Sequence, residues 1–359
     1  MTPKNIINDV HLGVKRMGGT TPLTQGLVQQ GIQDSFHGYL MTHTDADLVI
    51  NGDLFDGFSV DVVWVVACYM SLVEWFAKSD HTLYLVAGNH DIGKRNDRKS
   101  SFDVLADLLS ERFPTRTIVV KNEPYSEDGM HIIPHMLNQD IFNMALEQAL
   151  SWEPGWLLLH ANVDNGFAEE SDHSLNVSRE QLLELSKTHK LLFAHEHQAR
   201  DVEMPGNRHA IRVLGNQWPT SIVDCRSADN AQLDGCKYAH QISDSGITEE
   251  ETWRAEDDYS EVDWTGLFDT NARFLRVTGT AGASQAADVI TAIAKFRQNS
   301  EAWVITNGVK IEGIQDSAEI HSMTLERLSS INILDELIEH LTDAEAVVVK
   351  KLLAEGAAA

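Results

Sequence analysis

The stretch Ile50-Asn-Gly-Asp-Leu-Phe-Asp56 decides the fold that the sequence predicts. It joins a short apolar run, residues 48–50, to a glycine and two acidic residues. A second apolar run, residues 83–86, leads in the same way into Gly88-Asn-His-Asp91. Apolar runs that end in polar residues are typical of buried strands in a layered α/β domain, whose loops present chemical groups at the sheet edge. The sequence therefore predicts an α/β fold.

The same pattern recurs along the chain as far as about residue 225, with helical patterns between the runs. The candidate strands are residues 6–7, 48–50, 83–86, 118–120, 132–133, 157–159, 191–193, 211–214 and 222–223. One uncharged apolar run, residues 62–73, is longer. It is shorter than the roughly 20 residues that span a bilayer, so it predicts a buried helix and no membrane partner.

The composition is that of a globular protein with a strongly acidic balance. The 359 residues include 28 Lys and Arg against 54 Asp and Glu, a formal charge of −26. Nonspecific binding to nucleic acid depends on Lys and Arg, so such binding would need a local basic surface here. Three cysteines without a paired spacing, and an N-terminus without a secretory signal, predict a cytoplasmic protein.

Metal-binding residue types gather at the predicted strand ends. Seven of them are candidate ligands: Asp9, His11, Asp53, Asn89, His160, His195 and His197. Such oxygen and imidazole donors suit Mn, Fe or Zn, and no cysteine accompanies them. One ion needs about four to six ligands, so Asp53 is expected to bridge two ions. Two ions that clamp a phosphoryl group and activate a bridging hydroxide predict phosphoester hydrolysis.

These motifs resemble those of the calcineurin-like metallophosphoesterase superfamily, whose pattern is D-x-H, GDxxD, GNH[DE], a lone His and GHxH. One position departs from it, because Ala194 replaces the glycine of the last motif. The resemblance implies a two-sheet β-sandwich flanked by helices. The sequence Asp9-Val-His-Leu-Gly13 is similar to the corresponding motif of the SbcD-type nucleases of double-strand-break repair. Gly57, where protein phosphatases have arginine, argues against that branch of the superfamily.

The resemblance also implies a role for each matching residue. One ion would be held by Asp9, His11, Asp53 and His197, and the other by Asp53, Asn89, His160 and His195. His90 would lie beside the scissile phosphate and stabilise or protonate the leaving oxygen. Asp56 and Asp91 are expected to hold loops through hydrogen bonds, and Glu196 is left out of the ligand set.

Four segments are predicted from the composition. They are a phosphoesterase domain at residues 1–240, an acidic linker at 241–265, a small β-α-β cap domain at 266–316 and a C-terminal helical segment at 317–359. The last segment has the pattern of two amphipathic helices. Packing on its own chain and docking to a partner are both open.

Six basic residues follow two of the motifs. They are Lys15, Arg16, Lys94, Arg95, Arg98 and Lys99. They form either ordinary polar loops or a local positive rim that guides a phosphate backbone to the site.

The leading hypothesis is a Mn-dependent DNA exonuclease or endonuclease, a subunit of an SbcCD-like repair or recombination complex with an SbcC-like coiled-coil ATPase. Mg, Fe or Zn would also suit the ligands, and a homodimer is left open. The alternative is a stand-alone metallophosphodiesterase of nucleotides or other small phosphodiesters. A third hypothesis, a DNA-end tether that does not cut, has no need for a complete ligand set.

Overall fold

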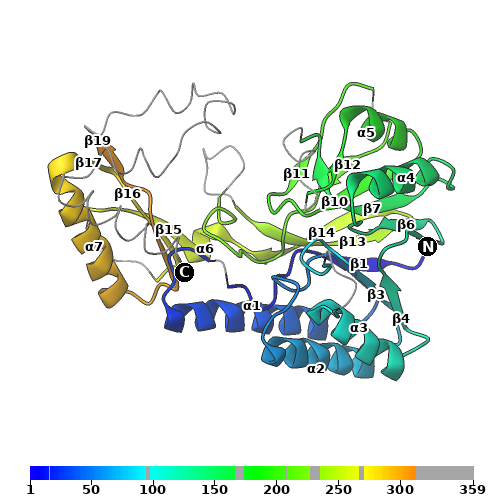
Figure 1. Ribbon diagram of the computed structural model, residues 1–359, viewed down its shortest axis with the longest axis horizontal. Coiled ribbons are helices and arrows are strands. Elements are labelled where there is room, and N and C mark those ends of the chain that lie inside the picture. Colours follow the sequence, from blue (N-terminus) through cyan, green and yellow to red (C-terminus); the bar gives the residue numbers. More distant parts are fainter. Residues whose placement is uncertain are drawn as a thin grey trace, which may run out of the picture. The chain divides into compact units, whose positions relative to one another are not determined.

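The computed structural model describes residues 1–15, 17–93, 98–165, 174–206, 208–226, 235–266 and 271–312. The chain divides into two compact units. The first comprises Met1–Gly279 and Val289–Val309, and the second comprises Thr280–Asp288 and the chain from Lys310 onward. The first unit contains two six-stranded sheets with helices beside them (Figure 1).

The first sheet has the strand order β14-β13-β1-β2-β3-β4. Its strands are β1 (Lys4–Ile7), β2 (Asp47–Asn51), β3 (Leu83–Val86), β4 (Thr117–Val120), β13 (Lys237–Ser243) and β14 (Gly246–Trp253). Strands β1 to β4 are parallel, and β13 pairs antiparallel with β1. The parallel strands therefore end at one edge, where the loops that follow them meet.

The second sheet has the order β11-β12-β10-β7-β6-β5. Its strands are β5 (Tyr125–Glu127), β6 (Met130–Ile133), β7 (Trp156–His160), β10 (Lys190–Ala194), β11 (Arg200–Asp201) and β12 (Ile211–Val213). The four central strands are parallel, and β5 and β11 pair antiparallel at the edges. The register places His160 opposite Ala194, so β7 and β10 end together.

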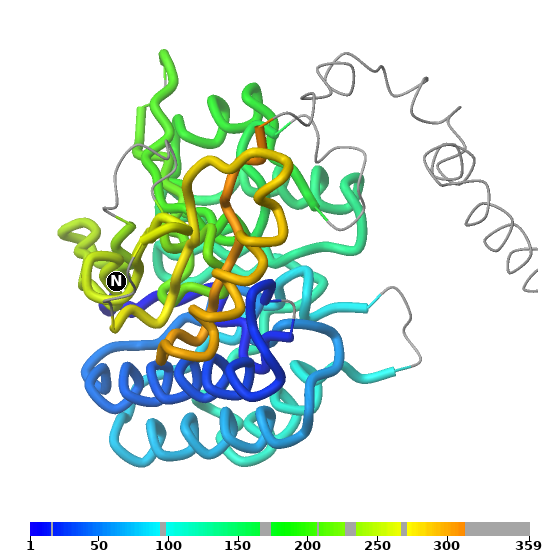
Figure 2. Tube along the Cα trace, turned by 90° about the vertical axis from the view of Figure 1, so that its left-hand side faces the viewer, coloured from blue at the N-terminus to red at the C-terminus, as the bar shows by residue number. Residues whose placement is uncertain are grey.

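Five helices cover the outer faces of the two sheets. They are α1 (Pro22–Thr42), α2 (Val62–Lys78) and α3 (Ser101–Arg112) on the first sheet, and α4 (Gln139–Ala149) and α5 (Arg179–Leu185) on the second. Both Figure 1 and Figure 2 show α1 and α2 side by side. Thr21 and Ser100 begin α1 and α3 with capping boxes, which satisfy backbone N–H groups of the first turn.

The buried residues separate into layers because alternate residues of a strand face opposite sides. Ile6 and Val49 of the first sheet pack against Leu158 and Leu192 of the second, between the sheets. The neighbouring residues Ile7 and Leu48 pack outward against the helices. Strands covered on both faces explain the uninterrupted apolar runs. The predicted two-sheet α/β sandwich is confirmed.

The remaining described elements lie outside the two six-stranded sheets. A short pair comprises β8 (Asn162–Val163) and β9 (Asn176–Val177), and a parallel sheet of order β15-β16-β18 comprises β15 (Tyr259–Asp263), β16 (Phe274–Thr278) and β18 (Val304–Asn307). The helices here are α6 (Ala255–Asp258) and α7 (Ala286–Asn299). In the second unit, β17 (Thr280–Gly282) pairs with β19 (Lys310–Glu312), and η1 is Ala283–Gln285.

Three expectations need correction. The predicted acidic linker, residues 241–265, is largely strand: Glu249, Glu250 and Glu251 lie on the edge strand β14, where their side chains reach solvent. The predicted strand at residues 222–223 is instead part of a series of turns. The helix at residues 62–73 is buried on one face only, because Val62, Val66 and other apolar residues are exposed.

The β-α-β pattern predicted within residues 266–316 is present as β16, α7 and β18. The predicted helical segment, residues 317–359, lies outside the described residues. Among the residues that are described, no helix is both long and apolar enough to cross a membrane.

Candidate metal centre

The candidate ligands come together where the parallel strands of both sheets end. Asp9 and His11 follow β1, Asp53 follows β2, and Asn89 follows β3; His160 ends β7, and His195 and His197 follow β10. The loops are joined by backbone hydrogen bonds, from Asp9 N to Gly52 O (3.1 Å) and from His11 N to Asp53 O (3.0 Å).

The backbone at this edge is unusual. Seven of the described non-glycine residues have a positive φ, and four of them are candidate ligands: Asp9 (49°), His11 (52°), Asp53 (47°) and His195 (87°). A positive φ costs free energy for residues other than glycine, and such strain is concentrated at functional sites. The fold holds these side chains in conformations that aim them at one another.

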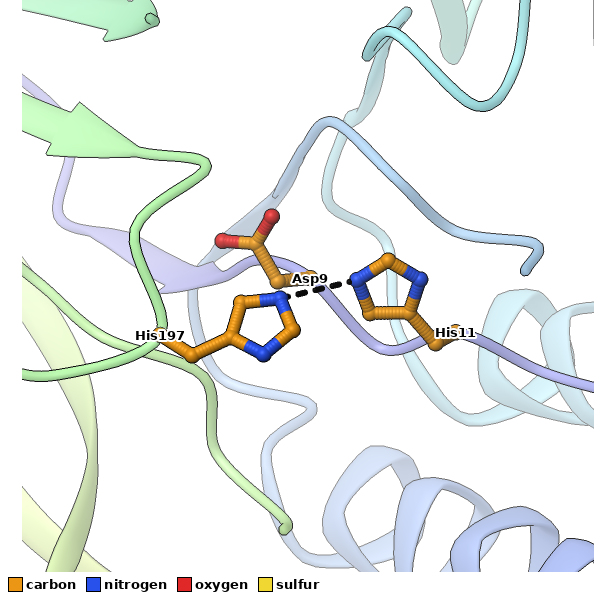
Figure 3. Close-up of side chains that lie close together, drawn as sticks. All are labelled: Asp9, His11 and His197. Atoms are coloured by element: carbon orange, nitrogen blue, oxygen red, sulfur yellow. Dashed lines mark hydrogen bonds between the residues drawn. The ribbon is translucent and has the colours of Figure 1, made fainter. Parts of the chain in front are cut away.

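One group of donors comprises Asp9, His11 and His197 (Figure 3). The Nε2 atoms of His11 and His197 lie 3.1 Å apart. The Asp9 carboxylate accepts a hydrogen bond from His195 N (3.0 Å) and one from Asn8 Nδ2 (2.6 Å). Two imidazole nitrogens that face each other beside a carboxylate match the ligand preferences of a divalent transition metal.

A second group comprises Asp53, His160 and His195, with Asn89 between the histidines. Asn89 Oδ1 lies 3.0 Å from His160 Nε2 and 2.9 Å from His195 Nδ1. Asp53 Oδ2 lies 3.4 Å from His160 Nε2 and 3.9 Å from His11 Nε2, so this carboxylate lies between the two groups. That is the position expected of a bridging ligand.

Burial lowers the pKa of these histidines, and the Asp53 carboxylate raises it. Burial, and then the neighbouring His197, lower the pKa of His11 to about 4. Burial, and then His160, lower the pKa of His195 to about 4. Burial acts in the same direction on His160, but the Asp53 carboxylate outweighs it and raises the pKa of His160 to about 9. His11 and His195 are therefore neutral at pH 7, the form in which imidazole binds a metal.

His90 lies beside the first group. Its ring meets the His11 ring edge-on with the centroids 5.0 Å apart, and its Nδ1 donates to the carbonyl oxygen of Asp56 at 2.7 Å. Its backbone N donates to Asp53 Oδ1 at 2.9 Å. Nδ1 is thus occupied, and Nε2 is the nitrogen of His90 left for a substrate.

The other acidic residues of the motifs hold loops, as expected. Asp56 Oδ2 accepts a hydrogen bond from Lys15 N at 3.0 Å, and Asp91 Oδ2 accepts one from Gly88 N at 2.9 Å. Burial, and then the Asp53 charge, raise the pKa of Asp91 to about 7. Glu196 lies outside the ligand groups and accepts from Val163 N at 2.8 Å. Ala194 is buried at the end of β10.

Two polar residues near the ligands have no motif in the sequence. Asp224 is buried 3.3 Å from His197 Nδ1, and His135 lies beside His160 with the ring centroids 6.2 Å apart. Asp224 follows the apolar pair that was interpreted as a strand. Only its position in the fold, and no spacing in the sequence, brings it to the site.

The predicted basic rim is described only in part. Arg16, Lys94 and Arg95 lie outside the described residues. Of the rest, Lys15 pairs with Asp61 (3.4 Å) and Lys99 pairs with Asp107. Arg98 and Lys99 line one cleft, together with Asp103, Asp107 and Lys121. The described part of the rim therefore has mixed charge.

Known proteins were compared with this chain. A family model described as calcineurin-like phosphoesterase matches residues 5–199. No curated protein matches. Among solved structures, the chain is similar to the phosphopantetheinyl hydrolase PptH from Mycobacterium tuberculosis, with 12% identity and a TM-score of 0.35 over 59% of this chain and 89% of that one. It is also similar to the nuclease MPE from Pseudomonas putida, with 13% identity and a TM-score of 0.29 over 69% and 87% of the two chains. Because the family model spans more than half of its residues, this chain belongs to the calcineurin-like phosphoesterases, a family of metal-dependent hydrolases.

Proposed function

We propose that this protein is a Mn-dependent phosphodiesterase that acts on DNA, as the exonuclease or endonuclease subunit of an SbcCD-like repair or recombination complex. The observation that supports it is the cluster of seven donor side chains from both sheets, with His90 at its side. A protein that only tethers DNA ends would not need that set.

The donors fit two divalent ions. Oxygen and imidazole donors without thiolate suit Mn, and the Nε2 atoms of His11 and His197 face each other 3.1 Å apart beside Asp9. Asp9, His11, Asp53 and His197 would hold one ion, and Asp53, Asn89, His160 and His195 the other. When bound there, two such ions would polarise a phosphoryl group and lower the pKa of the attacking water.

His90 is the residue proposed to act on the leaving group. Its Nδ1 proton is held by the Asp56 carbonyl at 2.7 Å, which fixes the ring. A proton carried on Nε2 can then pass to the leaving oxygen as the P–O bond breaks. In neutral His90, Nε2 carries no proton, so it is the imidazolium form that acts as the acid.

DNA and a small phosphodiester differ in the charge that each requires around the site. DNA binding by a chain of charge −26 requires the basic loops beside the site. The alternative, hydrolysis of a small phosphodiester, is favoured by the carboxylates that pair with Lys15 and Lys99.

The test compares substrates with the same metal. Purified protein is assayed with Mn on linear duplex DNA, single-stranded DNA, a chromogenic phosphodiester and a cyclic nucleotide. We expect cleavage of DNA and of the chromogenic diester. Cleavage of the small substrates alone would replace the DNA proposal by its alternative, and DNA binding without any cleavage would support the tether.

A double variant tests the basic loops. Arg98→Ala with Lys99→Ala removes two rim cations, and Lys187→Ala with Lys295→Ala removes two exposed cations elsewhere. We expect the rim variant to weaken DNA binding and to reduce the slope of log K against log salt by about 2, while hydrolysis of the chromogenic diester is retained. Equal losses of DNA binding in the two double variants would reject the proposed role of the basic rim.

The proposed partner is an SbcC-like coiled-coil ATPase, and the proposed location is the cytoplasm of a bacterial cell or of an infected host. A homodimer is also proposed. Light scattering of the purified protein, alone and with a candidate ATPase, tests both assemblies. A monomer that binds no ATPase would contradict them.

A further inference from the structure

Asp224 lies in the turns that follow β12, beyond the residues matched by the family model. Its side chain is 4% exposed. His197 Nδ1 lies 3.3 Å from Asp224 Oδ1 and 3.4 Å from Oδ2. A buried carboxylate therefore contacts the candidate ligand His197, on the side of its ring away from the donor group.

The Asp224 carboxylate is itself fixed in place. Its Oδ2 accepts hydrogen bonds from Thr220 N (2.8 Å), Thr220 Oγ1 (2.9 Å) and Asn216 Nδ2 (3.3 Å). Three donors on one oxygen set the plane of the carboxylate. The other oxygen, Oδ1, is left to face the His197 ring.

This arrangement determines which nitrogen of His197 carries the proton. An ionised carboxylate only accepts hydrogen bonds, so Nδ1 of the ring must donate. Nε2 then presents its lone pair to His11 Nε2 at 3.1 Å and to the side of the group where Asp9 lies (Figure 3). Lys237 Nζ donates to the carbonyl oxygen of His197 at 2.8 Å and fixes its backbone as well.

The segment that contains Asp224 also forms hydrogen bonds with Asn8, the residue before Asp9. Gly215 O accepts from Asn8 Nδ2 (2.7 Å), and Gln217 Oε1 accepts from Asn8 N (2.7 Å), directly before Asp9. Gly215 has φ of +68°, and a Cβ there would lie 3.0 Å from His197 O and 2.8 Å from Ala199 N. Residues 215–224 thus contact the chain next to Asp9, through Asn8, and His197, through Asp224.

We propose that Asp224 is a positioning residue, which holds the proton of His197 on Nδ1 and so makes Nε2 the ligand atom of the Asp9–His11–His197 group. A carboxylate that accepts from the far nitrogen of a metal-binding histidine fixes both its tautomer and its orientation. The proposal rests on the metal role in the proposed function and is independent of DNA as the substrate.

The second group is oriented differently. His160 Nδ1 donates to the backbone oxygen of Asn51 at 3.2 Å, so a main-chain carbonyl, and not a carboxylate, orients this ring. A change at residue 224 should therefore weaken one metal site and spare the other.

The test is Asp224→Asn. The three donors from Thr220 and Asn216 require an acceptor, so the amide oxygen should take the place of Oδ2 and the amide NH2 should face His197 Nδ1. An NH2 group donates, which favours an accepting Nδ1 over one that donates to the hydroxyl oxygen of Thr220 at 3.4 Å, and moves the ring proton to Nε2. Nε2 then has no lone pair for a metal.

Two readouts need no substrate. ¹⁵N NMR of the metal-free protein, with the His197 signal identified by its loss in His197→Gln, should show the proton on Nδ1 in the wild type and on Nε2 in Asp224→Asn. Mn titration followed by electron paramagnetic resonance should show one of two sites weakened about 10- to 100-fold. Asp45→Asn, an exposed residue before β2, removes the same charge and should bind both ions normally.

A wild-type His197 with its proton on Nε2 overturns the proposal, and this measurement stands even if Asp224→Asn does not fold. Equal Mn binding by Asp224→Asn and the wild type also overturns it. Failure to cleave DNA, with both readouts as expected, would count against the proposed substrate alone.

Discussion

Gly52, in the loop that follows β2, is the position where one added methyl group should disturb the site most. It has φ of +87°, and a Cβ built there would lie 2.0 Å from His160 Nδ1. Ordinary contact begins at 3.4 Å, so the His160 ring would have to move by more than 1 Å, which is the difference between these distances. His160 is fully buried, so it has little room to move.

The cost of Gly52→Ala has two parts. A left-handed backbone costs about 1–2 kcal/mol for a residue with a Cβ. Overpacking of a buried site adds about 1–3 kcal/mol. The sum, about 2–5 kcal/mol, should lower the Tm of the metal-free protein by at least about 3 °C, at about 1.3 °C per kcal/mol for a chain of 359 residues. Displacement of His160 should also weaken the metal site that contains Asn89.

Gly57→Ala is the matched control in the same loop. A Cβ at Gly57 meets no atom within 4 Å, and its φ is not in the positive range. Calorimetry of both metal-free variants, followed by Mn titration, measures the two effects separately. The reasoning would be refuted if Gly52→Ala matched Gly57→Ala in both Tm and Mn affinity.

Further predictions concern catalysis, metal and acid stability. His90→Ala should keep both Mn ions and lose most of the hydrolysis, whereas Asp53→Ala should lose metal as well. Metal analysis and rate measurements on both variants test this. An undiminished rate in His90→Ala would remove that residue from the mechanism. Mn at about 100 times its Kd should stabilise the folded protein by about 2.7 kcal/mol for each independent site, a gain that chelation should reverse and that calorimetry measures. Burial, and then Arg212, lower the pKa of His240 from 6.5 to about 4. The unfolded chain therefore binds the His240 proton more tightly than the folded chain. The titration of His240 does not change the free energy of unfolding above pH 6.5, and it lowers that free energy increasingly as the pH falls toward 4. The loss reaches at most about 3 kcal/mol, at 1.36 kcal/mol per pKa unit. His240→Phe should remove it, and urea unfolding between pH 7 and 4.5 with the same pH slope in both proteins would contradict this.

The fold was predictable because the strands carry two independent signals. Runs such as Leu83-Tyr-Leu-Val86 are apolar throughout because both faces of the parallel sheets are covered. Five of the predicted strands lead into a motif, and parallel strands bring their ends to one edge of a sheet. The gathering of Asp53 and Asn89 follows from that geometry, whereas His160 ends a strand of the second sheet and reaches them because the two sheets pack face to face.

Other features could not be read from the sequence. The charge run between Glu249 and Asp263 indicates a linker because its side chains cannot easily be buried, but the edge strand β14 leaves Glu249–Glu251 in solvent. No sequence pattern identifies Asp224, because His197, the candidate ligand that it contacts, lies 27 residues away along the chain. The pairing of Lys99 with Asp107 depends on the geometry of α3, which no local pattern shows.

The central claim is that two metal ions lie among the seven donor side chains. A crystal soaked in manganese and measured at the metal absorption edge tests it directly. We expect two anomalous peaks, one bounded by Asp9, His11 and His197 and the other by Asn89, His160 and His195, with Asp53 between them. A single peak elsewhere, or no peak at saturating manganese, would contradict this account.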